Sequence, residues 1–240
     1  MDILPLGDSS LLVRVCERVG NMPQETIQQV LNVQRRIEAA KIPGIVDLAP
    51  AYTTIGVFYD PIQAVAKGAS PEGIFSWLAT RIHQALADEV RAVSLAASPV
   101  KSRRIEIPVC YGGEFGPDLE DVARIAGLTP EELIRRHSEG EYYVHCLGFT
   151  PGFPYLSGLA PELAMPRRDV PRKEIPAGSV GIGGSQTGIY PLRSPGGWHL
   201  IGRTPFRLFS VDGDPPSLLR PGDRVRFCAI TPADFDAWRE

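Results

Sequence analysis

The chain has 240 residues, of which 43% are hydrophobic and 22% are charged, so it can bury a sizeable core and lacks the composition of a disordered protein. Its 25 basic and 28 acidic residues give a formal net charge of -3, which argues against a polyanionic partner such as nucleic acid. The length favours two domains over one.

The first eight residues lack the basic and apolar regions of a secretion signal, and no uninterrupted apolar run in the chain is long enough to cross a bilayer. The cysteines are scattered without paired spacing, which is typical of reduced core residues: Cys16, Cys110, Cys146 and Cys228. We therefore expect a cytoplasmic protein with no membrane segment.

Strand-like and helix-like patterns alternate over the first hundred residues. Residues 10–15 read as a strand, and a helix follows that begins near Pro23 and ends at Pro43. Residues 45–48 and 54–59 read as two strands joined by a turn at Pro50.

A second helix is predicted to begin at Ser70, which would cap it ahead of Pro71, and residues 90–95 read as a last strand. The order β-α-β-β-α-β predicts a ferredoxin-like domain over residues 1–97, within an α+β protein. Small and polar residues at 96–102 predict a linker.

The second domain is predicted to span residues 103–240. It begins with a strand at 104–111 and two short helices, one at about 118–126 and one opened by a capping box at Thr129 and Glu132. Short strand-like runs separated by Gly and Pro turns then follow: 142–147, 180–182, 198–201, 206–211 and 224–230. Many short strands separated by such turns favour a closed or sandwiched antiparallel β domain.

Three segments combine residues that shape the backbone with charged or aromatic groups. In the first, at 148–156, prolines and glycines predict a firm loop that presents aromatic rings, although these rings could equally fill the core. With a later Pro-Gly-Gly-Trp turn it forms a predicted pocket or partner contact: Phe149, Pro151, Gly152, Phe153, Tyr155, Pro195, Gly196, Gly197 and Trp198.

The second segment joins an arginine-rich run at 166–173 to a glycine-rich run at 176–188. Glycine-rich backbone can present amides to an anion, and arginine can bind a carboxylate or phosphate through paired hydrogen bonds. The candidate anion-binding residues are Arg167, Arg172, Arg203, Gly178, Ser179, Gly181, Gly183, Gly184, Gln186 and Thr187. The spacing fits neither a P-loop nor a dinucleotide fingerprint, and the charges could equally lie in solvent or pair with acids.

In the third segment, a strand at 198–203 would place His199 and Arg203 on one face. His199, His145 and Tyr190 are the candidate catalytic groups, and a structural role for each histidine stays open. The chain has no HExxH, paired-cysteine, G-x-S-x-G or Met-Lys-Met motif, so we expect no metal site and no independent serine hydrolase. The chemistry would then need groups from another chain.

The same segments match a known pattern, at residues 143–156, 166–172, 176–181, 186–191, 194–205 and 218–223. They resemble the KipI / allophanate hydrolase subunit 1 family, strongly over residues 103–227. In the first domain the resemblance rests on element order and on the opening at residues 4–8. It implies a ferredoxin-like domain followed by a cyclophilin-like β-barrel of the carboxyltransferase type.

Bacterial members of this family include the B-type subunit of 5-oxoprolinase, PxpB. The resemblance implies that the chain acts with a PxpC/KipA-type and a PxpA-type subunit to open 5-oxoproline to L-glutamate, with ATP as the co-substrate of the complex. It implies arginine contacts to anions, a glycine loop (178–184) that stabilises an oxyanion, and proton transfer by a histidine. It also leaves open a KipI-type inhibitor of a sensor histidine kinase and a carboxyltransferase or allophanate hydrolase-associated subunit.

Overall fold

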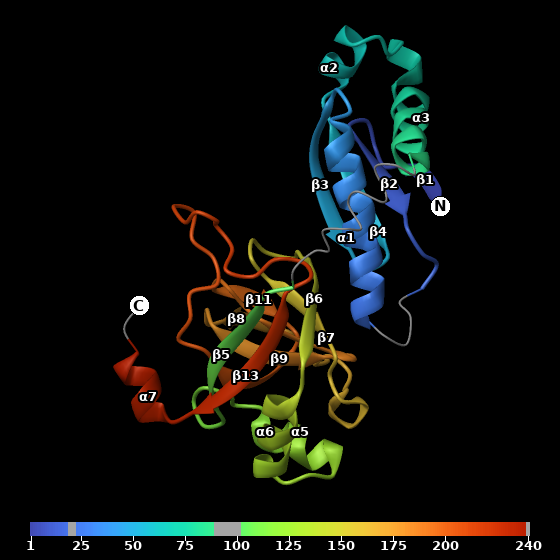
Figure 1. Cartoon of the computed structure of the whole chain (residues 1–240). Coiled ribbons are helices and arrows are strands. Elements are labelled where there is room, and N and C mark those ends of the chain that lie inside the picture. The colour runs from blue at the N-terminus through green and yellow to red at the C-terminus, as the bar shows by residue number, and fades with distance from the viewer. Residues whose placement is uncertain (19–22, 89–101, 239–240) are drawn as a thin grey trace. The chain divides into compact units, whose positions relative to one another are not determined.

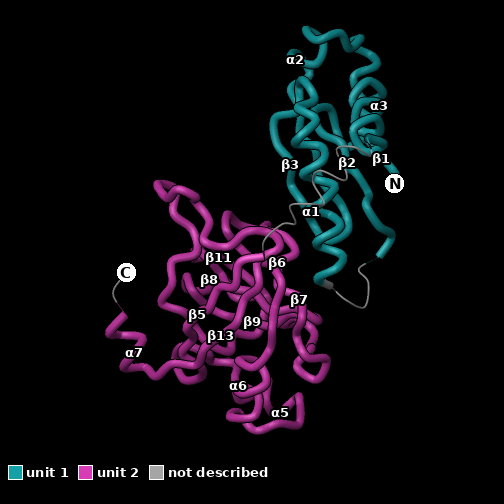
Figure 2. The backbone as a smooth tube through the Cα atoms, viewed as in Figure 1, with its two compact units in different colours: residues 1–101 teal, residues 102–240 magenta. Residues whose placement is uncertain are grey.

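The computed structural model of the protein describes residues 1–18, 23–88 and 102–238. The chain divides into two compact units, Met1–Lys101 and Ser102–Glu240, which Figure 2 colours separately. Each unit has its own hydrophobic core.

Unit 1 is an antiparallel sheet with helices on one face (Figure 1). The strands follow the order β1 (Asp2–Pro5), β2 (Ser10–Arg14), β4 (Thr54–Tyr59), β3 (Ile45–Ala51). The helices are α1 (Pro23–Ala40), α2 (Pro61–Ala66) and α3 (Ile74–Ala87), with a 3₁₀ turn, η1 (Pro71–Gly73), before α3.

Alternation along the strands decides which side chains form the core of unit 1. Leu11 and Val13 of β2 and Ile55 and Val57 of β4 are fully buried. They face the apolar stripes of α1 and α3, as the period of two in a strand and of 3.6 in a helix requires. Each such burial contributes about 1.5–3 kcal/mol.

The predicted strands and helices of unit 1 are confirmed, with three differences. The turn lies at Tyr52, which has φ 52°, because β3 continues through Pro50; a proline is tolerated there since β3 is an edge strand. Ser70 makes no side-chain cap, and the first turn is 3₁₀. The short edge strand β1 and helix α2 were not predicted, and the predicted strand at 90–95 lies outside the described residues.

Unit 2 is built on a closed barrel of seven strands, in the order β10-β7-β6-β13-β5-β12-β9. Along the chain these are β5 (Arg104–Tyr111), β6 (Tyr142–Leu147), β7 (Pro154–Ser157), β9 (Ser179–Gly183), β10 (Gln186–Ile189), β12 (His199–Arg203) and β13 (Arg224–Ile230). A separate two-stranded sheet pairs β8 (Arg172–Ile175) with β11 (Ser194–Gly196). The helical segments are α5 (Leu119–Ala126), α6 (Pro130–Glu139), η2 (Pro161–Leu163) and α7 (Pro232–Ala237).

The barrel interior is filled by alternate residues of its strands, such as Val180 and Ile182 of β9 and Val225 and Phe227 of β13. Side chains from α5 and α6 join this cluster; Leu133 of α6 is fully buried. The residues between the inward positions therefore face outward, and this outer face of β9 and β10 carries the candidate site.

Three details of unit 2 correct the sequence predictions. The barrel is not wholly antiparallel, because β5 and β13 pair in parallel. Residues 206–211 form no strand and contribute only an isolated bridge between Phe209 and Ser217. Thr129 caps α6 by accepting from the Glu132 amide, but the Glu132 carboxylate pairs with arginines and does not complete a capping box.

Candidate functional site

Aromatic rings from separate segments pack edge to face beside the outer face of β9 and β10. The ring of Phe153 lies 5.5 Å from Trp198, 5.2 Å from Tyr190 and 5.0 Å from Tyr155, centroid to centroid. Phe153, Tyr190 and Trp198 are buried in a small cluster of their own. The predicted aromatic contacts are thus brought together, although most of their surface is used in packing.

The glycines of β9 and β10 form a flat surface beneath Trp198. A Cβ atom added at Gly183 would lie 2.5 Å from the indole, and one at Gly188 would lie 3.0 Å from both Trp198 and Phe153. Gly181 pairs directly with Gly188 across the two strands. Glycine occurs here because the indole leaves no room for a side chain.

The glycine-rich run therefore does not form the expected loop of free amides. The amides of Gly178, Ser179 and Gly184 donate to the carbonyls of Tyr190, Pro176 and Met165, and residues 179–183 form a central barrel strand. The oxyanion role expected for residues 178–184 gains no support from this geometry, since the amides of Gly178, Ser179 and Gly184 already donate within the barrel domain. Gln186 begins β10 opposite Gly183.

The arginine-rich run forms the wall of a cleft of about 580 Å³. Its lining residues are Ile125, Met165, Pro166, Arg167, Arg168, Asp169, Val170 and His199. Arg167 is exposed and makes no ion pair or hydrogen bond with the residues that the structure describes. Burial raises the pKa of Tyr155 and Tyr190, and the charge of Arg167 acts against both shifts.

The carboxylate of Asp118 holds this wall in place. It accepts two hydrogen bonds from Arg172, each 2.8 Å, one of 3.0 Å from Arg168, and one of 2.7 Å from the Leu200 amide. Burial raises the pKa of Asp118, but the hydrogen bonds from Arg172 and Leu200 outweigh this and leave the pKa lowered. Arg172, predicted to contact an anion, is therefore already bound inside the chain.

The predicted histidines have different surroundings. His145 lies at an irregularity of β6, is fully buried, and has a pKa lowered by that burial, which favours the neutral ring. His199 lines the cleft, and its Nε2 lies 3.0 Å from the carbonyl oxygen of Pro166. A carbonyl only accepts, so Nε2 carries a proton, and in the neutral ring Nδ1 is then an acceptor.

A third histidine, which the sequence analysis did not select, belongs to a buried hydrogen-bond chain. His137 Nδ1 lies 2.8 Å from the Tyr111 hydroxyl, and its Nε2 lies 3.1 Å from the hydroxyl of Thr187, which donates to the Gly181 carbonyl at 2.9 Å. Burial lowers the pKa of His137 to about 3, so the ring is neutral. Thr187, expected to bind an anion, is used inside the barrel.

Arg203 lies in another part of unit 2. Its Nε donates to the Ala177 carbonyl at 2.8 Å, and it lines a separate cleft of about 550 Å³ with Phe206, Phe235 and Trp238. The sequence prediction that Arg203 and His199 act at one site gains no support from this arrangement.

Phe149, one of the predicted contact residues, is 59% exposed. Its φ is 69°, and the Thr150 amide donates to the Gly148 carbonyl at 2.8 Å, which makes a tight three-residue turn around Phe149. A bulky residue rarely adopts this conformation. The neighbouring Pro151 and the β11 residue Pro195 are also exposed, while Gly196 and Gly197 are half-buried.

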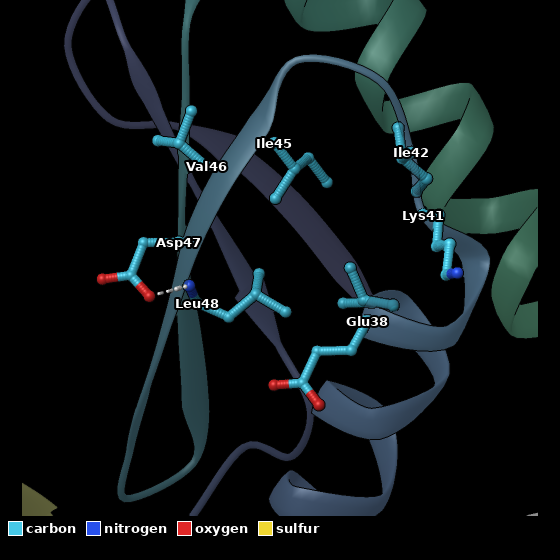
Figure 3. A pocket seen from close by; sticks show the side chains of 8 residues that line it. Glu38, Lys41, Ile42, Ile45, Val46, Asp47 and Leu48 are labelled. Carbon is cyan, nitrogen blue, oxygen red and sulfur yellow. Dashed lines mark hydrogen bonds between the residues drawn. The ribbon is translucent and has the colours of Figure 1, made fainter. Parts of the chain in front are cut away.

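Unit 1 has a hollow of about 280 Å³ between the end of α1 and β3 (Figure 3). Glu38 and Lys41 lie on one side, and the Asp47 carboxylate accepts from the Leu48 amide on the other. It contains no residue that the sequence analysis selected.

The described residues contain no group of three or more His, Cys, Asp or Glu side chains that could hold a metal ion. Within the same ranges, no helix is both long and apolar enough to cross a membrane.

Comparison with solved structures shows likeness in fold and sequence. A conserved uncharacterized protein from Pyrococcus horikoshii is 40% identical, with a TM-score of 0.55, over 98% of this chain and 100% of that one. The Kluyveromyces lactis urea carboxylase shares only 19% identity, with a TM-score of 0.71 over 98% of this chain and 22% of that one, which is a likeness of fold.

Curated relatives extend the likeness in sequence. The B-type subunit of 5-oxoprolinase from Bacillus subtilis is 46% identical over 237 residues, 98% of this chain and 95% of that protein. Its counterpart of the same name from Haemophilus influenzae is 41% identical over 227 residues, 95% and 97% of the two chains. A family model described as carboxyltransferase domain, subdomain C and D, matches residues 1–219. The chain therefore belongs to this carboxyltransferase domain family, which confirms the resemblance to the KipI / allophanate hydrolase subunit 1 group.

Proposed function

We propose that the chain is the B-type subunit of an ATP-dependent 5-oxoprolinase, which opens 5-oxoproline to L-glutamate together with a PxpC/KipA-type and a PxpA-type subunit. The observation that carries the proposal is the 46% identity to such a 5-oxoprolinase subunit over 98% of this chain. A relative that is similar along its whole length supports a shared function better than a shared fold does.

The cleft beside Arg167 suits part of this chemistry. The substrate carries a carboxylate, and ring opening develops negative charge on the amide oxygen, so a cation near the substrate is favourable. Arg167 has no partner among the described residues, whereas Arg172 is neutralised by Asp118. We therefore assign the carboxylate contact to Arg167, and withdraw Arg172 from that role.

Proton transfer is better assigned to His199 than to His145. His199 lines the same cleft as Arg167, while His145 is fully buried in the barrel wall. Tyr190 is also buried, and burial raises the pKa of its hydroxyl, which favours the protonated form. A positioning role therefore fits Tyr190 better than a role as a base.

The remaining chemistry is proposed to come from the other subunits. ATP would be the co-substrate of the assembly, and the described residues offer neither a P-loop nor a metal cluster for it. The exposed ring of Phe149, on its strained turn, is the proposed contact with a partner subunit. Because ATP is the co-substrate, a cytoplasmic location accompanies the proposal.

The proposed function also implies a fold type for each of the two units. The order β2-α1-β3-β4-α3 supports a ferredoxin-like unit over residues 1–97, although β1 occupies the sheet edge beside β2. The closed barrel supports a cyclophilin-like unit over residues 103–240.

The test is ATP-dependent hydrolysis of 5-oxoproline by the three purified subunits, repeated with each one omitted. We expect glutamate formation to fall to background without this chain. Arg167→Ala should reduce turnover at least about tenfold, as expected for the loss of a charge-assisted contact. The matched control is Arg193→Ala, an exposed arginine paired with Glu174. Undiminished turnover when this chain is omitted would refute the proposal.

A carboxyltransferase role is the second candidate, because the fold resembles that of urea carboxylase. It predicts carboxyl transfer from a biotinylated partner, which an assay with labelled bicarbonate would detect. A KipI-type inhibitor of a sensor histidine kinase would instead reduce kinase autophosphorylation in the absence of 5-oxoproline.

A further inference from the structure

The separate cleft of about 550 Å³ in unit 2 combines aromatic rings with positive charge. Its lining includes Phe206, Phe209, Phe235, Trp238, Arg203 and Arg207, and none of the lining residues is acidic. The acids of α7, Asp234 and Asp236, do not line it, and the Asp234 carboxylate is used in the cap of that helix. The cleft therefore offers an apolar surface with a net positive charge.

The rings come from two segments of unit 2, the loop at residues 205–209 and α7, the last helix in Figure 1. The ring of Trp238 lies 5.1 Å from that of Phe206, and the ring of Phe235 lies 4.6 Å from that of Phe115, centroid to centroid. Trp238 nevertheless stays 41% exposed. Because aromatic residues and arginine are enriched in the centres of protein interfaces, this combination favours a protein contact.

Arg203 brings an unpaired guanidinium to the cleft. Its Nε donates to the Ala177 carbonyl at 2.8 Å, and its Cζ lies 5.9 Å from the centre of the Phe235 ring. Its two terminal nitrogens make no hydrogen bond or ion pair with residues 1–18, 23–88 or 102–238. A guanidinium binds a carboxylate through paired hydrogen bonds from such nitrogens. A carboxylate is therefore the complementary group.

The cleft continues into the surface that carries Phe149. Phe209 lines the cleft and also a neighbouring hollow of about 390 Å³, which Phe149 and Pro151 line as well. Leu192 of the cleft and Phe149 of the hollow are both exposed. Exposed apolar surface with a charged rim marks a protein interaction site. Because this surface extends over two hollows, a segment of a protein chain covers it better than a small molecule does.

We propose that this cleft is the docking site for one segment of a partner subunit, in which an Asp or Glu lies next to an apolar side chain. The carboxylate pairs with the terminal nitrogens of Arg203, and the apolar side chain packs on the rings of Phe206 and Trp238. The existence of a partner subunit rests on the proposed function, whereas the chemistry of the docked segment rests on the cleft. The anion that Arg203 was predicted to bind is then a side chain of the partner.

The first test is hydrogen exchange of the backbone amides, followed by mass spectrometry, in the unaltered chain with and without the purified partner subunits. We expect the amides of residues 206–209 and of α7 to exchange at least about tenfold more slowly in the complex, because the docked segment excludes water from both. Unchanged exchange in both segments of an assembled complex would overturn the inference.

The second test removes the charge of Arg203 and keeps its structural hydrogen bond. In Arg203→Gln the side-chain amide nitrogen takes the position of Nε and can still donate to the Ala177 carbonyl. The dissociation constant for the partner subunits, measured by calorimetry, should rise about tenfold at low salt, and by less as added NaCl screens the pair. Arg124→Gln, at an exposed arginine paired with Asp121, is the matched control and should bind as the unaltered chain does.

The third test removes the exposed ring. Trp238→Ala should weaken binding of the partner subunits at least about tenfold, as expected for an aromatic anchor. Phe58→Ala is the control, because Phe58 in unit 1 is exposed to the same fraction of 41%. Trp238 lies in a helix without buried residues, so this variant is expected to fold. If either variant fails to fold, the exchange measurement on the unaltered chain decides the question.

Full affinity of both Arg203→Gln and Trp238→Ala, or equal losses in their controls, would also overturn the inference. Each of these results leaves the proposed function standing when omission of this chain still abolishes hydrolysis of 5-oxoproline. Conversely, slower exchange at the cleft and weaker binding of the two variants, together with unchanged hydrolysis after omission, would support the docking site and refute the proposed function.

Discussion

His137 and His199 both carry their proton on Nε2, yet they differ in what the other nitrogen does. In the barrel interior, His137 Nδ1 accepts from Tyr111 and its Nε2–H donates to Thr187. At the cleft, His199 uses Nε2 for Pro166, while its Nδ1 has no partner among the described residues. A buried network with all its bonds made supports the fold, whereas a buried nitrogen without a partner costs free energy.

The largest effect in this comparison should come from Asp118, which supports the cleft. Asp118→Ala leaves Arg168, Arg172 and the Leu200 amide without their shared acceptor, and should lower the free energy of unfolding by about 3–5 kcal/mol in urea titrations. Asp121→Ala, at an exposed pair with Arg124, should change it by less than about 1 kcal/mol. Equal effects of the two substitutions would show that Asp118 is no support at all.

Acid should destabilise the buried network around His137. The pKa of His137 is about 3 when folded and 6.5 in the reference state, so unfolding takes up a proton between these values. Neutral His137 makes its full contribution to the free energy of unfolding above pH 6.5. This contribution is lost as the pH falls towards 3, and the loss amounts to about 4 kcal/mol at most.

Unfolding free energies measured from pH 7 to pH 4 check this, with His137→Phe as the comparison because a phenyl ring can keep the stack on Phe227. The unfolding free energy of that variant should depend less on pH. Some pH dependence should remain because burial also lowers the pKa of His145. Identical slopes for the variant and the unaltered protein would contradict the network's role.

Gly183→Ala should lower the stability by less, because it affects only the packing of Trp198 on the outer face of β9. The added methyl would lie 2.5 Å from the Trp198 indole, so the ring must shift, at a cost of about 1–3 kcal/mol. A changed Trp198 fluorescence spectrum should accompany the lower unfolding midpoint. Ser185→Ala, at an exposed position of the adjoining turn, should leave both measurements unchanged.

The smallest effect is expected at Arg193, whose partner Glu174 is also exposed. Removing a surface pair changes stability by less than about 1 kcal/mol. Arg193→Ala should also leave hydrolysis by the complex unaltered. A loss of activity at Arg193 as large as that at Arg167 would show that charge near the barrel, rather than the cleft, governs the reaction.

Much of the fold follows from local patterns. The buried faces of β2 and β4 alternate with a period of two, and α1 and α3 carry apolar stripes, so these elements were predictable. The pairing of β5 with β13 was not, because no local pattern reports which strands meet 120 residues apart in a barrel. The run at 206–211 has strand-like residues but no neighbouring strand to pair with over its length.

The site was less predictable because distant residues decide the role of each group. Arg172 and Arg167 belong to one charged run, and only the position of Asp118, 54 residues before Arg172, makes one bound and the other free. The glycines of β9 resemble an anion-binding loop until Trp198 is placed on them. The sequence around His137 does not show that this residue is buried, since a histidine on a helix can equally well face solvent.

The parallel pairing of β5 and β13 determines where a label can be attached. Arg104 pairs with Arg224 at one end of the two strands, and Cys110 pairs with Ile230 at the other. Six residues of strand separate these ends by roughly 20 Å. A fluorophore fused beyond α7 is therefore attached at the opposite end of the strand pair from residue 104, where unit 1 joins, and suits energy-transfer measurements of complex assembly.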